Sequence, residues 1–215
     1  MEHNSHDENQ TGIKQPKAEE REVELPDLSG NRVIFDTNIF ISERNRADSF
    51  MQRIGNPKVY HTDITFDELY KNYKKPDRKR KEVLGQILRS FAAFNSSPLP
   101  RTGKTRKIAR RISRYLKRAG VPRKTVRQEK NDTTIVAYGM LRGIDVLTAD
   151  ELFYVMDKIF TTGIELHLTW KKKPKHRAAQ AKAILKKKGI KTPVDLTHLL
   201  DKAKTKKRHT PRKEA

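Results

Sequence analysis

The chain has 215 residues, with 48 Lys and Arg against 26 Asp and Glu, a formal net charge of +22 at pH 7, and no cysteine. The absence of cysteine excludes disulfide bonds, cysteine-ligated zinc and thiol catalysis. No apolar stretch is long enough to span a membrane and the first residues lack the pattern of a signal peptide, so we expect a cytoplasmic protein with no membrane association. The positive charge predicts binding to a polyanion such as nucleic acid.

This charge is unevenly distributed and suggests three parts. Residues 1–30 carry 3 basic against 8 acidic side chains and no periodicity, which predicts a disordered acidic leader. Residues 31–170 contain the regular apolar patterns and should form one globular domain, with a basic helical stretch at 74–130. Residues 171–215 carry 17 basic against 3 acidic side chains, and we expect a basic helical extension that ends in a tail.

In the first half of the domain, short β-branched runs alternate with segments of helical periodicity. The run RVIF (32–35) predicts a buried strand that ends in a polar turn, DTN (36–38). Thr65 and Glu68 fit a capping box at the start of a helix. The other expected elements are a helix at 46–54, a strand at 58–64, an amphipathic helix at 79–94 and a proline-rich break at 96–100.

The second half continues this alternation. Residues 104–118 place a thin apolar stripe on a helix covered in Arg and Lys, and Asn131 offers an N-cap for an apolar helix that ends at Gly143. Strands are expected at 145–150 and 163–169, and basic helices at 171–188 and 193–204, the second started by Thr192 and Pro193. The alternation predicts an α/β fold with a central, mostly parallel sheet, in which sites form beyond the carboxyl ends of the strands.

Four carboxylates stand where a hydrophobic run meets a polar turn or a helix start: Asp36, Glu68, Asp132 and Asp150. Carboxylates at converging strand ends repel one another unless a cation lies between them, and such cations can cleave a phosphodiester. Each acid also has a purely structural explanation as a helix cap, a turn residue or a member of the capping box. If the register differs by one turn, neighbouring acids would take their place: Asp63, Asp67 or Glu151.

Four segments in this order resemble the acidic motifs of the PIN-domain nucleases, a family that includes the VapC-like ribonucleases: VIFDTNIFIS (33–42), FDEL (66–69), NDTTIVAYG (131–139) and VLTAD (146–150). The resemblance spans residues 32–170. It implies an α/β/α sandwich around a parallel sheet of four or five strands. It also implies Mg²⁺ or Mn²⁺ held by the four acids, an RNA substrate (tRNA, rRNA or mRNA), and products with 5′-phosphate and 3′-hydroxyl ends.

The chemistry of Mg²⁺ favours this arrangement, because the ion keeps several waters and takes few protein ligands. Asp36 is the preferred direct ligand, since it follows a buried strand that fixes its backbone. Asp132 and Asp150 would complete the metal site, and Glu68 would bind the ion directly or through a water. Three neighbours would orient carboxylates and waters: Thr37, Asn38 and Thr148.

The basic helix at 104–118 is the expected RNA-binding surface, because its charge exceeds what solubility requires and Arg side chains suit phosphate contacts. Alternatively, these basic side chains only form a solvent-exposed face of the helix and bind nothing. The residues expected to contact RNA are Arg106, Lys107, Arg110, Arg111, Arg114, Lys117 and Arg118.

Several biological roles stay open. The chain could be the toxin of a toxin–antitoxin pair, with an antitoxin protein as partner, although its leader and basic extensions depart from small toxins of this type; a homodimer is also open. A second hypothesis is a non-catalytic RNA-binding or ribosome-associated protein on the same scaffold. A third is an architectural DNA-binding protein that uses the basic helices alone.

Overall fold

The computed structural model describes residues 25–100, 102–121, 130–169, 179, 181–183, 185–186 and 193–200. Residues 1–24 of the expected leader, most of the expected helix at 171–188 and the tail after residue 200 lie outside the described residues. None of the described helices is long and apolar enough to cross a membrane.

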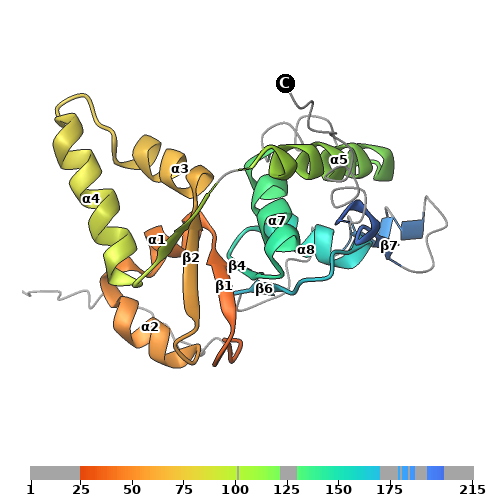
Figure 1. The fold of residues 1–215 in the computed structure, drawn as a ribbon, viewed down its shortest axis with the longest axis horizontal. Helices are drawn as coiled ribbons and strands as arrows, with labels where there is room; N and C mark the ends of the chain where they lie inside the picture. The colour runs from red at the N-terminus through yellow and green to blue at the C-terminus, as the bar shows by residue number, and fades with distance from the viewer. Residues whose placement is uncertain are drawn as a thin grey trace, which may run out of the picture.

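A five-stranded parallel sheet forms the centre of the fold, in the order β3-β2-β1-β4-β6 (Figure 1). This confirms the predicted α/β architecture. Since parallel strands need crossover connections, helices lie between consecutive strands. The strands are β1 (Arg32–Phe35), β2 (Lys58–Thr62), β3 (Ser97–Leu99), β4 (Asp145–Thr148) and β6 (Leu166–Leu168).

Side chains of the central strand alternate between two hydrophobic cores, one on each face of the sheet. Val33 and Phe35 of β1 pack into the first core, and Ile34 packs into the second. β1 is therefore buried on both faces, as expected for the inner strand of a parallel sheet covered by helices on both sides.

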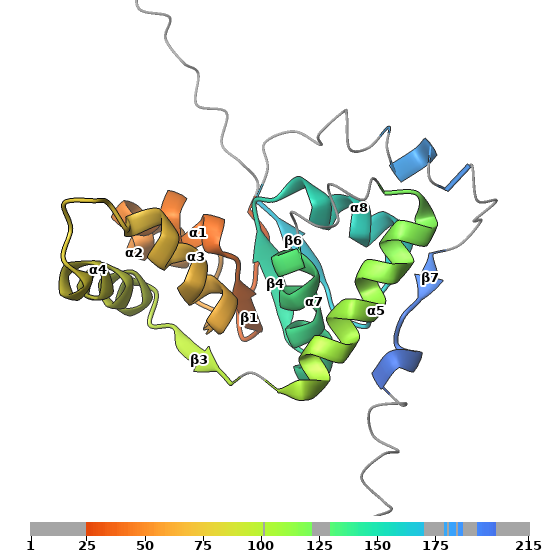
Figure 2. The ribbon, with the colours of Figure 1, turned by 90° about the horizontal axis from the view of Figure 1, so that it is seen from above.

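Helices cover both faces of the sheet, which gives three layers (Figures 1 and 2). The first face carries α1 (Thr37–Ser42), the 3₁₀ turn η1 (Arg44–Arg46), α2 (Ala47–Arg53), α3 (Asp63–Tyr73) and α4 (Arg80–Ala93). The second face carries α5 (Gly103–Ala119), α7 (Lys130–Arg142) and α8 (Glu151–Ile159). The predicted helices at 79–94 and 104–118 are confirmed as α4 and α5.

The segment after β1 differs from the expected polar turn. Asp36 is the N-cap of α1, which begins immediately at Thr37, and its side chain accepts a hydrogen bond from the Thr37 backbone N–H. The strand thus runs directly into a helix start, so the backbone at Asp36 is held from both sides.

The expected capping box at the start of α3 is shifted by three residues. Thr62 is the N-cap, and its hydroxyl accepts from the Thr65 backbone N–H while the Thr65 hydroxyl accepts from the Thr62 N–H. The expected strand at 58–64 is correspondingly shorter, because its last two residues open the helix. Glu68 lies in the second turn of α3 and is not a capping residue, so the structural explanation for this acid is wrong.

The proline-rich segment at 96–100 contains an edge strand rather than only a break. Ser97–Leu99 pairs with β2 in parallel register. Pro98 lacks an N–H, and an outermost strand tolerates proline because one of its edges needs no partner. A strand of three residues is too short for its periodicity to be seen in the sequence.

The C-terminal segment 193–200 packs on the domain. Val194–Asp195 forms β7, which pairs with β5 (Phe160–Thr161), and helical residues follow only from His198. The expected helix start at Thr192 and Pro193 is therefore wrong, because residues 194–195 are extended. Leu196 and Leu199 are buried in the second core, so this part of the basic extension belongs to the globular fold.

The last residues of the expected leader also join the domain. Leu28 is fully buried, and its backbone N–H donates to the Ile54 carbonyl over 2.9 Å. This apolar side chain packs into the first core beside α2. Within residues 1–30, the described segment 25–30 is therefore part of the packed structure.

Candidate functional site

All four predicted acids line one open cleft of about 360 Å³. The cleft lies beyond the carboxyl ends of β1, β2 and β4, where a parallel α/β fold places its sites. Four helices contribute to it: α1, α3, α7 and the N-cap of α8. The lining residues are Asp36, Thr37, Asn38, Glu68, Lys71, Asn72, Asn131, Asp132 and Asp150.

Asp36 is the most deeply held of these acids, with only 3% of its surface exposed. Its Oδ1 accepts from the Thr37 N–H over 2.7 Å, and its Oδ2 accepts from the Thr148 hydroxyl over 2.8 Å and from the Asn38 amide over 3.3 Å. The structure thus gathers the three residues expected to orient carboxylates around Asp36.

Burial has a marked effect on Asp36. Loss of hydration raises the pKa of its carboxyl to about 7, against the hydrogen bonds from Thr148 and Thr37, which lower it. The nearby charges of Glu68 and Asp150 raise the pKa further. A buried carboxylate beside two others is unfavourable without a positive partner, as expected for a cation site.

Glu68 is held at both carboxylate oxygens. The Thr37 hydroxyl donates to Oε2, and the Asn131 amide donates to Oε1 over 2.5 Å. These two bonds connect α3 to α1 and to α7 across the cleft. Glu68 is therefore positioned by residues from two other motifs, which explains why an acid in the second turn of a helix lies at the site.

Asp150 is the N-cap of α8 and accepts from the Leu152 backbone N–H over 2.7 Å. Its own backbone N–H donates to the Thr148 hydroxyl over 2.9 Å, and the same hydroxyl donates to Asp36. Thr148 consequently couples the backbone at Asp150 to the carboxylate of Asp36. Asp150 is thus a helix cap rather than the ordinary turn residue of its structural explanation, and it also lines the cleft.

Asp132 lies in the first turn of α7, where the helix dipole favours a negative charge. Its neighbour Thr133 is fully buried and lies 3.2 Å from the Ser113 hydroxyl of α5. This contact ties the basic helix to the acidic end of α7. Asp63 was considered as a replacement for a site acid if the register were shifted. Its carboxylate instead accepts a hydrogen bond from the Tyr138 hydroxyl over 2.6 Å.

Three cleft residues were not anticipated as site residues. Lys71 and Asn72 follow Glu68 by three and four positions on α3, a spacing that places them on the same helix face. That spacing was available in the sequence once Glu68 was chosen. Asn131 was interpreted as a helix cap, because an Asn before an apolar run is typical of one; in the structure α7 begins one residue earlier and the Asn131 amide binds Glu68.

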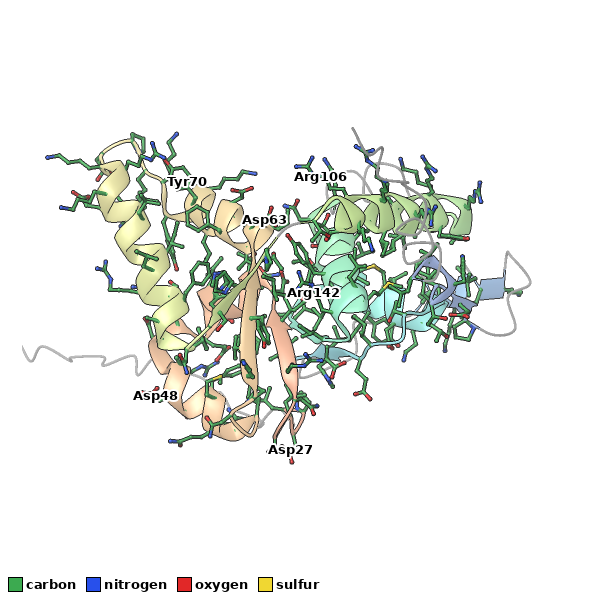
Figure 3. All side chains as sticks on the ribbon, viewed as in Figure 1. Asp27, Asp48, Asp63, Tyr70, Arg106 and Arg142 are labelled. Carbon is green, nitrogen blue, oxygen red and sulfur yellow. The ribbon has the colours of Figure 1, made fainter. Side chains whose placement is uncertain are left out.

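The seven basic residues expected to contact RNA all lie on α5. Six are exposed and Arg111 is half-buried, and none forms an ion pair with a carboxylate in the described part of the chain. Figure 3 shows Arg106 near the N-terminal end of α5. The helix starts at a Thr102 cap and ends at Gly120, whose φ of 94° suits glycine.

The donor set of the cleft fits a hard divalent ion, since it offers carboxylate oxygens and no sulfur or imidazole. Within the described ranges, no three His, Asp or Glu side chains are grouped tightly enough to hold one ion together. An ion such as Mg²⁺ needs no such group, because it commonly takes one or two carboxylate ligands and keeps several waters.

A protein-family model matches the region of the chain that forms this fold. Residues 33–159 match the model of the PIN domain. Among solved structures, the chain is similar to a chain of VapBC2 from Rickettsia felis bound to a DNA fragment from their promoter, with a TM-score of 0.48 and 15% identity over 62% of this chain and 96% of that chain.

A chain of DNA-bound VapBC from Salmonella typhimurium is similar with a TM-score of 0.46 and 16% identity, over 63% of this chain and 96% of that chain. No curated protein sequence matched. The family match covers more than half of the chain and includes Asp36, Glu68, Asp132 and Asp150, so the chain belongs to the PIN domain family.

Proposed function

We propose that this protein is a metal-dependent endoribonuclease that cleaves phosphodiester bonds of RNA in the acidic cleft. The observation that carries the proposal is the convergence of Asp36, Glu68, Asp132 and Asp150 from separate elements on one cleft of a strongly basic protein. Proteins of the PIN domain family are generally nucleases, which supports the same reaction class.

The four acids share the binding of the ion in this proposal. Asp36 would bind Mg²⁺ or Mn²⁺ directly, together with Asp132 or Asp150, and the remaining acids would hold waters around the ion. When bound, the ion would activate a water for attack on phosphorus and neutralise charge on the phosphate. Thr148 and Asn38 keep the Asp36 carboxylate in place, and Thr37 and Asn131 do the same for Glu68.

The test is incubation of the protein with a pool of structured tRNA, rRNA and mRNA fragments, with Mg²⁺, with Mn²⁺ and with EDTA. We expect metal-dependent cleavage that leaves 5′-phosphate and 3′-hydroxyl ends. Products with 2′,3′-cyclic phosphate ends, or cleavage that persists in EDTA, would contradict the proposal. Tight binding without cleavage of any RNA would favour a non-catalytic RNA-binding protein.

Removal of the Asn131 amide should weaken catalysis without unfolding the protein. Asn131→Ala deletes a donor to Glu68 and leaves that carboxylate held by Thr37 alone, so we expect a loss of cleavage rate of about 10- to 100-fold. Asn72→Ala is the matched control, because its amide donates to the Glu68 backbone carbonyl rather than to the carboxylate. A cleavage rate of Asn131→Ala equal to that of the intact protein would show that the Asn131 bond is irrelevant to activity.

We propose that α5 binds the RNA backbone, mainly along the flank that carries Ser113. The Ser113 hydroxyl lies 3.2 Å from that of Thr133, next to Asp132, so this flank borders the cleft helix α7. Arg106, Arg110 and Lys117 lie seven and three positions before and four after Ser113, which places them on the same flank. An RNA strand held there would lead toward the acids.

Two triple variants with equal charge loss test this proposal. Gln at the flank positions Arg106, Arg110 and Lys117 should lower RNA affinity on the order of tenfold or more and reduce the salt dependence of binding. Gln at Lys107, Arg114 and Arg118, which lie on the outer side of the same helix, should lower RNA affinity less. Identical losses in both triples would indicate only a general attraction of the net charge.

The proposal extends to two protein partners, an antitoxin that covers the cleft and a second copy of the chain. Light scattering of the purified protein measures its mass in solution and so tests for a dimer. A mass of 25.0 kDa, that of one chain, would contradict a dimer. An antitoxin that covers the cleft should suppress cleavage in the assay with the RNA pool. Substitution of cleft residues should weaken its binding.

A further inference from the structure

One cleft residue has a charge opposite to that of the acids. Lys71 is the only Lys or Arg among the cleft-lining residues of the described chain, and its side chain is exposed. It lies one turn after Glu68 on α3, so both side chains point to the same face of the helix. A single ammonium group therefore shares the cleft with four carboxylates.

Lys71 could in principle serve only to neutralise these acids. Within the described ranges, however, its ammonium forms no ion pair within 4 Å of a carboxylate. The nearest acid along the helix, Glu68, already accepts hydrogen bonds from Thr37 and Asn131 at its two oxygens. Lys71 lines the open cleft, so a ligand bound there can accept hydrogen bonds from its three N–H donors.

A structural role at the end of α3 is the second alternative. Lys71 lies in the last turn of that helix, where a positive charge interacts favourably with the helix dipole. Lys74 is the C-cap of the same helix, is exposed and does not line the cleft. The two lysines share the helix end and differ in access to the acids, so a comparison of the two separates these roles.

We infer that Lys71 contacts a non-bridging oxygen of the scissile phosphate, an inference that rests on the proposed ribonuclease function. A phosphodiester that enters the cleft brings a negative charge to a group of acids, and repulsion from them opposes its approach. The ammonium of Lys71 offsets that repulsion at the phosphate and stabilises the charge that builds there during attack. The same contact would hold the 5′-phosphate of the product.

Cleavage kinetics give the first test, with Lys71→Gln, Lys71→Arg and the control Lys74→Gln on an RNA that the intact protein cuts. Lys71→Gln should lower kcat on the order of 100-fold with a smaller change in KM. Lys71→Arg should keep most of the activity, because it keeps the charge, and Lys74→Gln should match the intact protein. A rate for Lys71→Gln within twofold of the control would overturn the inference.

Binding of a short oligonucleotide gives a second test that does not depend on cleavage. The probe is a hexanucleotide with a 5′-phosphate, compared with the same hexanucleotide with a 5′-hydroxyl, in Mg²⁺ buffer. The intact protein and Lys74→Gln should prefer the phosphorylated form roughly tenfold, and Lys71→Gln should lose this preference. No preference in the intact protein, or an unchanged one in Lys71→Gln, would refute the contact.

The two tests also separate this inference from the proposed function. A phosphate preference that depends on Lys71 in a protein that cuts no RNA would sustain the contact and reject the nuclease. Metal-dependent cleavage that is indifferent to Lys71 would sustain the nuclease and reject the contact.

Discussion

Asp36→Asn is expected to make the metal-free protein more stable at pH 8 than the intact protein. Burial raises the pKa of the Asp36 carboxyl from 3.8 to about 7, so the folded protein retains a proton that the unfolded chain has lost. The stabilising contribution of the protonated group is fully present below about pH 4 and is lost as the pH rises to 7. Across that window the loss corresponds to roughly 4 kcal/mol.

Thermal unfolding in EDTA between pH 5 and pH 8 measures this effect. The intact protein should lose several degrees in Tm relative to Asp36→Asn as the pH rises. Asp48→Asn removes a carboxylate at an exposed position of α2 and should follow the intact protein. If the Tm values of Asp36→Asn and of the intact protein change in parallel with pH, burial does not destabilise the ionised Asp36 carboxylate.

Addition of Mg²⁺ at pH 8 should reverse the order of stability. An ion that binds only the folded state raises the free energy of unfolding in proportion to the logarithm of its concentration above Kd. The intact protein should therefore gain stability, and Asp36→Asn should gain little because its amide is neutral and a poorer ligand. Equal gains for both proteins would place the ion elsewhere.

Asp150→Asn is expected to lower cleavage at least 100-fold with little effect on folding. Asn is as good an N-cap as Asp, so it can still accept the hydrogen bond from the Leu152 N–H that starts α8. The negative charge beside Asp36 is lost, and with it a carboxylate that can hold the cation or its waters. The substitution therefore separates the capping role of this residue from its role in the cleft.

Single-turnover cleavage and thermal unfolding of Asp150→Asn should be measured together. Asp157→Asn is the control, since Asp157 lies on the same helix, pairs with Lys158 over 2.7 Å and does not line the cleft. The control should retain full activity. An active Asp150→Asn protein would mean that this acid is only a cap.

The acidic site could be predicted from the sequence because its strongest signals are local. Asp36 follows a continuous apolar run and Asp150 ends another, and in a parallel sheet the ends of such strands converge. The helices α4 and α5 were also predicted correctly, since each carries apolar residues at helical spacing along one face.

Short strands and tertiary contacts could not be predicted in the same way. β3 and β7 contain three and two residues, so neither shows a period of two, and β3 includes a proline. Each exists because a neighbouring strand offers a free edge, which is a property of the folded sheet. The burial of Leu196 and Leu199 depends on the same tertiary context.

The capping roles expected for Thr65 and Asn131, and the capping alternative for Glu68, were wrong for a related reason. The pattern T-x-x-E fits a capping box, but Thr62 precedes it and competes for the cap, and Thr62 and Thr65 form the reciprocal bonds. Glu68 is therefore available to bind the Asn131 amide from α7, 63 residues later in the chain. Sequence spacing alone could not decide whether Thr62 or Thr65 caps the helix.

The most direct test of the account is cleavage and binding of one RNA by the intact protein and by Asp36→Asn, each with Mg²⁺ and with EDTA. We predict that both proteins bind the RNA with similar affinity and that only the intact protein with Mg²⁺ cleaves it, with a rate at least about 1,000-fold above that of Asp36→Asn. Because Asp36→Asn is expected to be the more stable protein without metal, its inactivity could not be attributed to unfolding. Cleavage by Asp36→Asn at the rate of the intact protein would contradict a metal-dependent nuclease centred on Asp36.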